Sequence, residues 1–146
     1  MSNDARRAAV VALTELARST DVRDRADAGH GLAAFAEMTD ARAILASLVL
    51  DEDDTFVTAV TAEALLRRKD AAGLSIVAAA FAVADATQSE WIGTALQDVY
   101  GVFAAERDAA VRICTTLTRD PDPRIRSGAT DLITELNRIE PILHPA

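Results

Sequence analysis

The chain has little of the chemistry from which disulfides and metal sites are built. Its 146 residues include one cysteine, Cys114, and two histidines, His30 and His144. A single cysteine excludes an intrachain disulfide and a multi-cysteine metal site, so we expect a reducing, cytoplasmic environment and no cofactor. Using both histidines as ligands would require the proline-flanked tail around His144 to fold back. We predict that Cys114 is a small core residue rather than a reactive thiol.

Long uncharged stretches and aromatic residues are also scarce. Aromatic residues make up 4% of the chain, and the longest uncharged run, Ala71 to Ala84, is too short to span a bilayer. The apolar run near the N-terminus is interrupted by Glu15 and Arg18. We therefore expect neither a membrane segment nor a signal peptide.

Basic residues are outnumbered by acidic ones. Fifteen lysines and arginines stand against 23 aspartates and glutamates, which gives a formal net charge of −8. The average field of the protein repels a phosphate backbone, so we do not expect a nucleic-acid partner. The same field attracts a basic protein, although net charge is also an ordinary means of staying in solution.

What the chain has in quantity is helix-forming hydrophobic sequence. Half of its residues are hydrophobic, and apolar positions recur about every 3.6 residues, which predicts a single all-α domain over residues 1–140 followed by a tail over 141–146. Pro141 and Pro145 mark the end of the fold. The predicted helices span residues 4–18, 21–37, 40–50, 54–69, 70–84, 88–104, 106–119 and 122–138.

Every second predicted helix repeats a pattern at a nearly constant period. The leading apolar residues are spaced by 35, 34 and 34 residues, and they are Val22, Val57, Trp91 and Ile125. A small side chain follows each of them after four residues, at Ala26, Thr61, Ala95 and Ala129. A lone helix pair cannot cover its apolar stripe, so this period predicts an α-solenoid of about four antiparallel helix pairs.

Two copies of the repeat carry a recognisable motif. The segment Asp122 to Ala129, and less completely Asp21 to Ala26, resembles the Asp-x-x-Val-Arg-x-x-Ala signature of HEAT repeats. The resemblance implies second helices that line a concave, protein-binding surface. It also implies that Arg23 and Arg126 join adjacent repeats in a polar ladder. The two central copies lack this arginine, so we expect more apolar stacking or irregular repeats there.

Several polar residues and one tryptophan are predicted to stabilise the fold rather than to bind a ligand. Asp40, Asp54 and Ser89 are predicted N-caps, and the acidic cluster Asp51 to Asp54 is predicted to be a turn with a cap rather than a calcium loop. Trp91 is predicted to be a core residue rather than a platform for a nucleic-acid base, because an acidic groove would not hold DNA.

The outward face of the second helices provides the candidate binding surface. The residues of these helices that lie outside the row of core positions form a polar, mostly acidic strip. Tyr100 adds an amphipathic side chain that could anchor a partner there. The predicted partner-binding residues are Asp24, Asp27, Glu63, Gln97, Tyr100 and Asp131. The alternative is that this strip is an ordinary solvated surface.

These features predict a non-catalytic protein-interaction module, monomeric or weakly homo-oligomeric, that binds a protein partner on an acidic concave face. A more specific hypothesis is an immunity or inhibitor protein that neutralises a basic toxin. A lyase or DNA-glycosylase-type enzyme of HEAT-like fold is a rival hypothesis, but no nucleophile, acid/base pair or metal-ligand set supports it. A scaffold or a fragment of a longer array is a third alternative.

Overall fold

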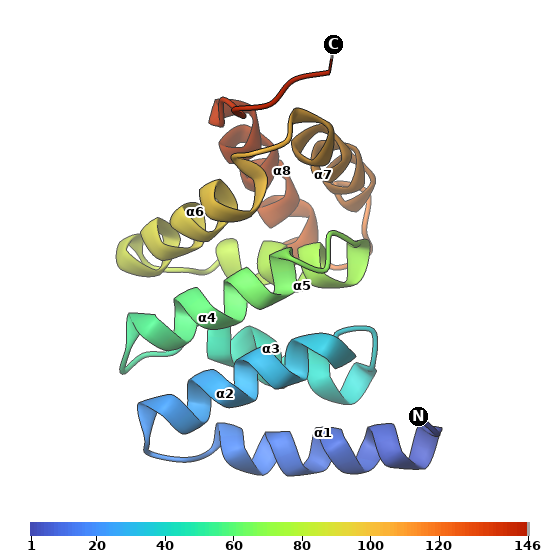
Figure 1. Ribbon diagram of the computed structural model, residues 1–146, viewed down its shortest axis with the longest axis vertical. Coiled ribbons are helices and arrows are strands. Elements are labelled where there is room, and N and C mark those ends of the chain that lie inside the picture. The colour runs from blue at the N-terminus through green and yellow to red at the C-terminus, as the bar shows by residue number, and fades with distance from the viewer. Residues whose placement is uncertain (146) are drawn as a thin grey trace.

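The computed structural model describes residues 1–145 as eight α-helices joined by short turns (Figure 1). The helices are α1 (Asn3–Ala17), α2 (Val22–Leu32), α3 (Thr39–Val49), α4 (Thr55–Leu66), α5 (Ala71–Phe81), α6 (Ala86–Tyr100), α7 (Ala104–Leu117) and α8 (Pro123–Arg138). A short 3₁₀ helix, η1 (Ala33–Phe35), extends α2. No strand occurs among the described residues, so the predicted all-α fold is confirmed.

An aspartate caps the second helix of every pair. The four caps are Asp21 on α2, Asp54 on α4, Asp85 on α6 and Asp122 on α8. Each side chain accepts a hydrogen bond from a backbone N–H of the first turn, which has no partner within the helix. The predicted cap at Asp54 is confirmed. Those at Asp40 and Ser89 are wrong, because both residues lie inside the first turns of their helices.

The helices stack in two layers to form an α-solenoid (Figure 1). Helices α1, α3, α5 and α7 follow one another in the first layer, and α2, α4 and α6 follow one another in the second. Each added pair covers the apolar face that the preceding pair leaves open. The predicted stacking of helix pairs is therefore confirmed for the body of the chain.

Helix α8 departs from this regular stack. It lies against α5 and α7, and it contacts α6 much less than α4 does. Gly128 permits the close crossing with α5, since a Cβ atom at this position would lie 1.7 Å from the carbonyl oxygen of Ala78. The lean of α8 onto α5 leaves the outward faces of α6 and α8 separated by a groove.

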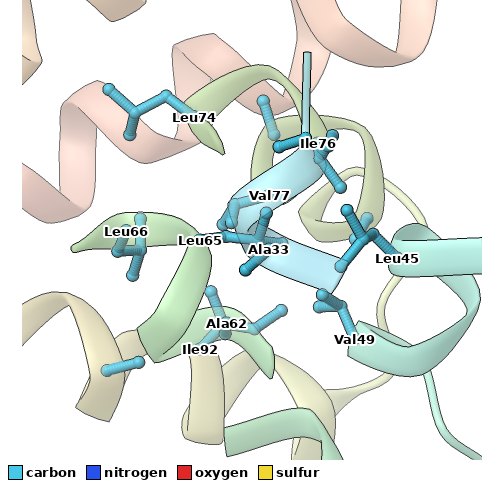
Figure 2. Close-up of a cluster of buried hydrophobic side chains, with 14 of the residues drawn as sticks. Ala33, Leu45, Val49, Ala62, Leu65, Leu66, Leu74, Ile76, Val77 and Ile92 are labelled. Atoms are coloured by element: carbon cyan, nitrogen blue, oxygen red, sulfur yellow. The ribbon is translucent and has the colours of Figure 1, made fainter. Parts of the chain in front are cut away.

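The core lies between the two layers and is almost entirely aliphatic. Figure 2 shows part of it, where Leu45 of α3, Leu65 of α4, Val77 of α5 and Ile92 of α6 meet from different helices. All four are inaccessible to solvent. Burying a side chain of this size stabilises the fold by about 1.5–3 kcal/mol, so the core carries most of the favourable free energy.

The core contradicts one sequence prediction and confirms another. Trp91 is 41% exposed, whereas its neighbour Ile92 is fully buried, so Ile92 is the core residue that α6 contributes at this point of the repeat. The prediction of a core position at Trp91 is therefore wrong by one residue. One residue along an α-helix rotates the side-chain direction by about 100°. Cys114 is fully buried, as predicted.

A buried ion pair joins the first two repeats. The Arg25 guanidinium donates to both carboxylate oxygens of Asp51, at 2.9 and 3.2 Å, and to the Ser19 carbonyl at 3.1 Å. The arginine that links adjacent repeats here is Arg25, so the prediction that Arg23 and Arg126 do so is wrong. Arg23 is exposed, and Arg126 donates to carbonyls of the turn that precedes its own helix.

The turns between successive pairs carry a second polar network. Arg68 donates to the Ala33 carbonyl at 2.9 Å and pairs with Glu37 and Asp70, while Glu37 also pairs with Arg6. Burial by itself raises the pKa of Glu37, but hydrogen bonds and the two guanidinium charges lower it overall. This network, in which Asp70 also caps α5, connects the first three pairs at the turns that join one pair to the next.

The segment after α8 is attached to the body of the fold. The Leu143 N–H donates to the Val102 carbonyl at 2.7 Å, and the Ala104 N–H donates to the Leu143 carbonyl at 2.9 Å. Phe103 and Leu143 thus form a short parallel bridge between this segment and the α6–α7 turn. The start of the predicted tail is part of the packed structure.

Candidate functional site

A groove lies between α6 and α8, with a cavity volume of about 640 Å³. A second hollow of about 220 Å³ shares three of its lining residues and extends it along α8. We call the two together the α6–α8 groove. It is lined by Phe81 at the end of α5, by Ser89, Glu90, Gly93, Thr94 and Gln97 of α6, and by Asp131, Thr134 and Glu135 of α8.

Helical periodicity places the α6 residues on one wall. Ser89, Gly93 and Gln97 are spaced by four, and Glu90 and Thr94 form the adjacent row, so all five share one face of the helix. The direction of this face is set by the buried opposite side of α6. The start of the helix is fixed by a capping box, in which the Asp85 side chain accepts from the Gln88 N–H at 2.7 Å.

The groove carries negative charge without a lining cation. Its carboxylates are Glu90 on the α6 wall and Asp131 and Glu135 on the α8 wall, and neither lysine nor arginine lines it. Glu135 pairs with Arg138 one turn away at 2.9 Å. Among the described residues, no ion pair involves Glu90 or Asp131. The groove therefore attracts a positively charged group.

The structure brings two of the six predicted site residues together. Gln97 and Asp131 lie on opposite walls of the α6–α8 groove. The carboxylate of Glu63, on α4, is held at 2.7 Å by Arg67, the residue that directly follows this helix. Asp24 accepts a hydrogen bond from the Ser19 hydroxyl at 2.7 Å, and Asp27 is exposed on α2. None of these last three lines the groove.

Tyr100 corrects the prediction of a surface anchor. Its side chain is fully buried, and its hydroxyl donates to the Leu66 carbonyl at 3.2 Å. Burial strongly raises the pKa of this phenol, so the hydroxyl stays protonated as a donor. Tyr100 therefore joins α6 to the end of α4 and offers no surface to a partner.

The most densely acidic part of the chain is used by the fold itself. Asp51 binds Arg25 and accepts from the Asp54 N–H at 3.0 Å, while Asp54 caps α4 by accepting from the Phe56 N–H at 2.8 Å. The predicted capped turn is confirmed. A hollow of about 250 Å³ lies between this turn and the start of α6, and the carboxylate of Asp85 there caps α6.

The groups that could perform chemistry lie apart from one another. Burial raises the pKa of the Cys114 thiol to about 12, so it is protonated and inert inside the core. His30 and His144 are exposed on α2 and in the C-terminal segment. Within residues 1–145, no three histidine, cysteine or acidic side chains come close enough together to hold a metal ion. No helix in that range is both long and apolar enough to cross a membrane.

Sequence reasoning missed most of the groove lining, although a signal for it was present. Glu90, Gly93 and Gln97 recur at spacings of three and four residues, and Asp131 and Glu135 are four apart, so each set shares a helix face. Treating Trp91 as the core residue left Glu90 and Gly93 out of the predicted strip, although Gln97 was included. The meeting of the two sets depends on the lean of α8, which no periodicity encodes.

Comparison of the chain with protein-family models, with curated proteins and with solved structures finds no match.

Proposed function

We propose that this protein is a non-catalytic interaction module that binds a basic segment of another protein in the α6–α8 groove. The observation that carries the proposal is the groove itself, a hollow of about 640 Å³ whose walls present carboxylates and no cation. Two of these carboxylates, Glu90 and Asp131, have no ion-pair partner among the described residues. A cationic partner gains attraction there without first displacing an internal one.

The composition of the groove supports a protein segment over a small molecule. Phe81 is the one large apolar residue in its lining, and the other residues are polar apart from Gly93. Small-molecule sites are mostly apolar, with few polar groups. Polar walls and charge complementarity are instead typical of protein interfaces that gain speed and selectivity from electrostatics.

The proposal includes the HEAT-repeat family and a cytoplasmic location. The family assignment is supported by stacked helix pairs with a recurring aspartate cap and by the motif from Asp122 to Ala129. The location is supported by the single, buried cysteine.

A basic toxin neutralised by this chain is the second candidate for the partner. The net charge of −8 on 146 residues supports it, because long-range attraction accelerates the capture of a basic enzyme. In this version the module acts as an immunity or inhibitor protein, with the same groove as its contact surface.

Affinity capture from the native host tests the proposal. The doubly substituted Glu90→Lys/Asp131→Lys protein is compared with Asp27→Lys/Asp98→Lys, which changes the net charge equally at exposed residues outside the groove. We expect the first variant to lose the captured partner and the second to retain it, with both showing native circular dichroism. Equal recovery by both variants would refute the groove as the binding site.

A further inference from the structure

Gly93 stands apart from the other glycines of this protein. A Cβ atom built at Gly93 meets no atom within 4 Å, so nothing inside the chain requires a glycine there. A Cβ atom at any of the other five glycines would lie within 3 Å of another atom. Gly93 is nevertheless in the middle of α6, where glycine weakens a helix relative to alanine.

The chain itself shows what glycine accomplishes inside a helix. At Gly128, α8 lies directly on the backbone of α5, where a Cβ atom would be 1.7 Å from the Ala78 carbonyl oxygen. At Gly29, α2 approaches α4 so closely that a Cβ atom would be 2.0 Å from the Thr61 hydroxyl oxygen. Both glycines mark points where another helix lies so close that a side chain of any size would clash with it.

Gly93 likewise lies inside a helix, but no other element comes within 4 Å of a Cβ atom built there. It lies in the α6 wall of the groove, between Ser89 one turn before and Gln97 one turn after. Glu90 lies on the same wall, and Asp131 and Glu135 lie on the opposite one. The site therefore combines an open, uncovered helix backbone with flanking negative charge.

We infer that the partner segment in the groove is a basic amphipathic helix that crosses α6 at Gly93. The inference rests on the proposed function and specifies the form of its ligand. A small residue of the partner helix faces Gly93 at the crossing point. Lysine or arginine side chains one turn to either side reach Glu90 and Asp131.

The acidic turn Asp51 to Asp54 is the competing site for such a helix. It holds more carboxylates than the groove, but Asp51 and Asp54 already bind Arg25 and backbone N–H groups. A helix attracted by charge alone would favour the turn, whereas one recognised by shape and charge would favour the groove. Whether a basic helix binds the acidic turn or the α6–α8 groove therefore tests the inferred crossing at Gly93.

The test uses a synthetic peptide of about 18 residues, long enough to be helical, with lysines along one face and alanine at its centre. Amide chemical-shift changes in the labelled protein map its binding site. We expect them to concentrate on Ser89 to Gln97 and Asp131 to Glu135. A matched peptide with two central prolines cannot form the helix and should bind about tenfold more weakly or worse. Shift changes centred on Asp51 to Asp54, or equal binding of both peptides, would overturn the inference.

Gly93→Ala provides the second arm of the experiment. The added methyl group should raise the Tm by about 1–4 °C, because it improves helix propensity without a clash. It should also weaken binding of the helical peptide by about tenfold, because it blocks the close crossing. Unchanged affinity of this stabilised protein would overturn the inference.

Different results would exclude the proposed function and the helical form of its ligand. If Glu90→Lys/Asp131→Lys abolishes capture of the native partner while Gly93→Ala leaves it intact, the proposed function stands and the helical ligand is wrong. If neither change affects capture, the proposed function itself is wrong.

Discussion

Replacing Gly128 by alanine should destabilise the protein, although alanine is the better helix former. The new Cβ atom would lie 1.7 Å from the Ala78 carbonyl oxygen, half of the 3.4 Å at which ordinary contact begins. The obstructing atom belongs to the backbone of α5, which cannot rotate away as a side chain can. Overpacking of this kind costs about 1–3 kcal/mol, and we take the upper value because backbone must move. Subtracting about 1 kcal/mol of helix propensity leaves a net loss of about 2 kcal/mol.

Urea denaturation followed by far-ultraviolet circular dichroism measures this loss, and thermal unfolding should show a Tm lower by about 4–8 °C. Gly93→Ala is the matched control, because the same chemical change on α6 meets no atom within 4 Å. The control should gain about 0.5–1 kcal/mol. A Gly128→Ala protein as stable as this control would refute the close crossing of α8 on α5, and with it the origin of the groove.

Three further substitutions or modifications test the interior. Arg25→Met should cost about 3 kcal/mol in the free energy of unfolding, because it leaves a largely buried carboxylate unpaired. A double-mutant cycle with Asp51→Asn should show a coupling of about 1–3 kcal/mol, and additive effects would exclude the ion pair. Tyr100→Phe should cost about 0.5–1.5 kcal/mol, the usual value of one hydrogen bond, and a neutral result would contradict the bond to Leu66. Cys114 should resist thiol reagents at neutral pH until guanidinium unfolds the chain, since burial raises its pKa to about 12; labelling of the folded protein would contradict that burial.

The helices and their stacking could be predicted because local signals agree with the tertiary structure. Aspartates in the turns become N-caps, as Asp54 shows, and apolar residues at helical spacing become the core. Such signals depend on the neighbouring few residues and on a period near 34. These signals can therefore be recognised in a single sequence.

The candidate site was predicted less completely because it depends on the exception to the repeat. Gln97 and Asp131 were expected on one continuous strip along the second helices. They lie instead on opposite walls of a groove, which opens beside α6 because Gly128 lets α8 lean onto α5. A glycine in a sequence does not reveal which backbone it will touch. The packing angle of α8 therefore could not be predicted from the spacing of apolar residues.

Errors of one residue had larger consequences for function than for fold. Placing Trp91 instead of Ile92 in the core left the predicted number of helices unchanged but turned the assigned outer face of α6. Tyr100 was then assigned to the surface, although it is fully buried. On a helix, each such step rotates the assigned face by about 100°.

Hydrogen exchange of the protein in complex with its captured partner tests the central claim most directly. Amides of residues 89–97 in α6 and 131–135 in α8 should become slower to exchange, while those of the acidic turn 51–54 should exchange as in the free protein. Protection centred on the turn, or on the first layer of helices with none along the α6–α8 groove, would contradict the account.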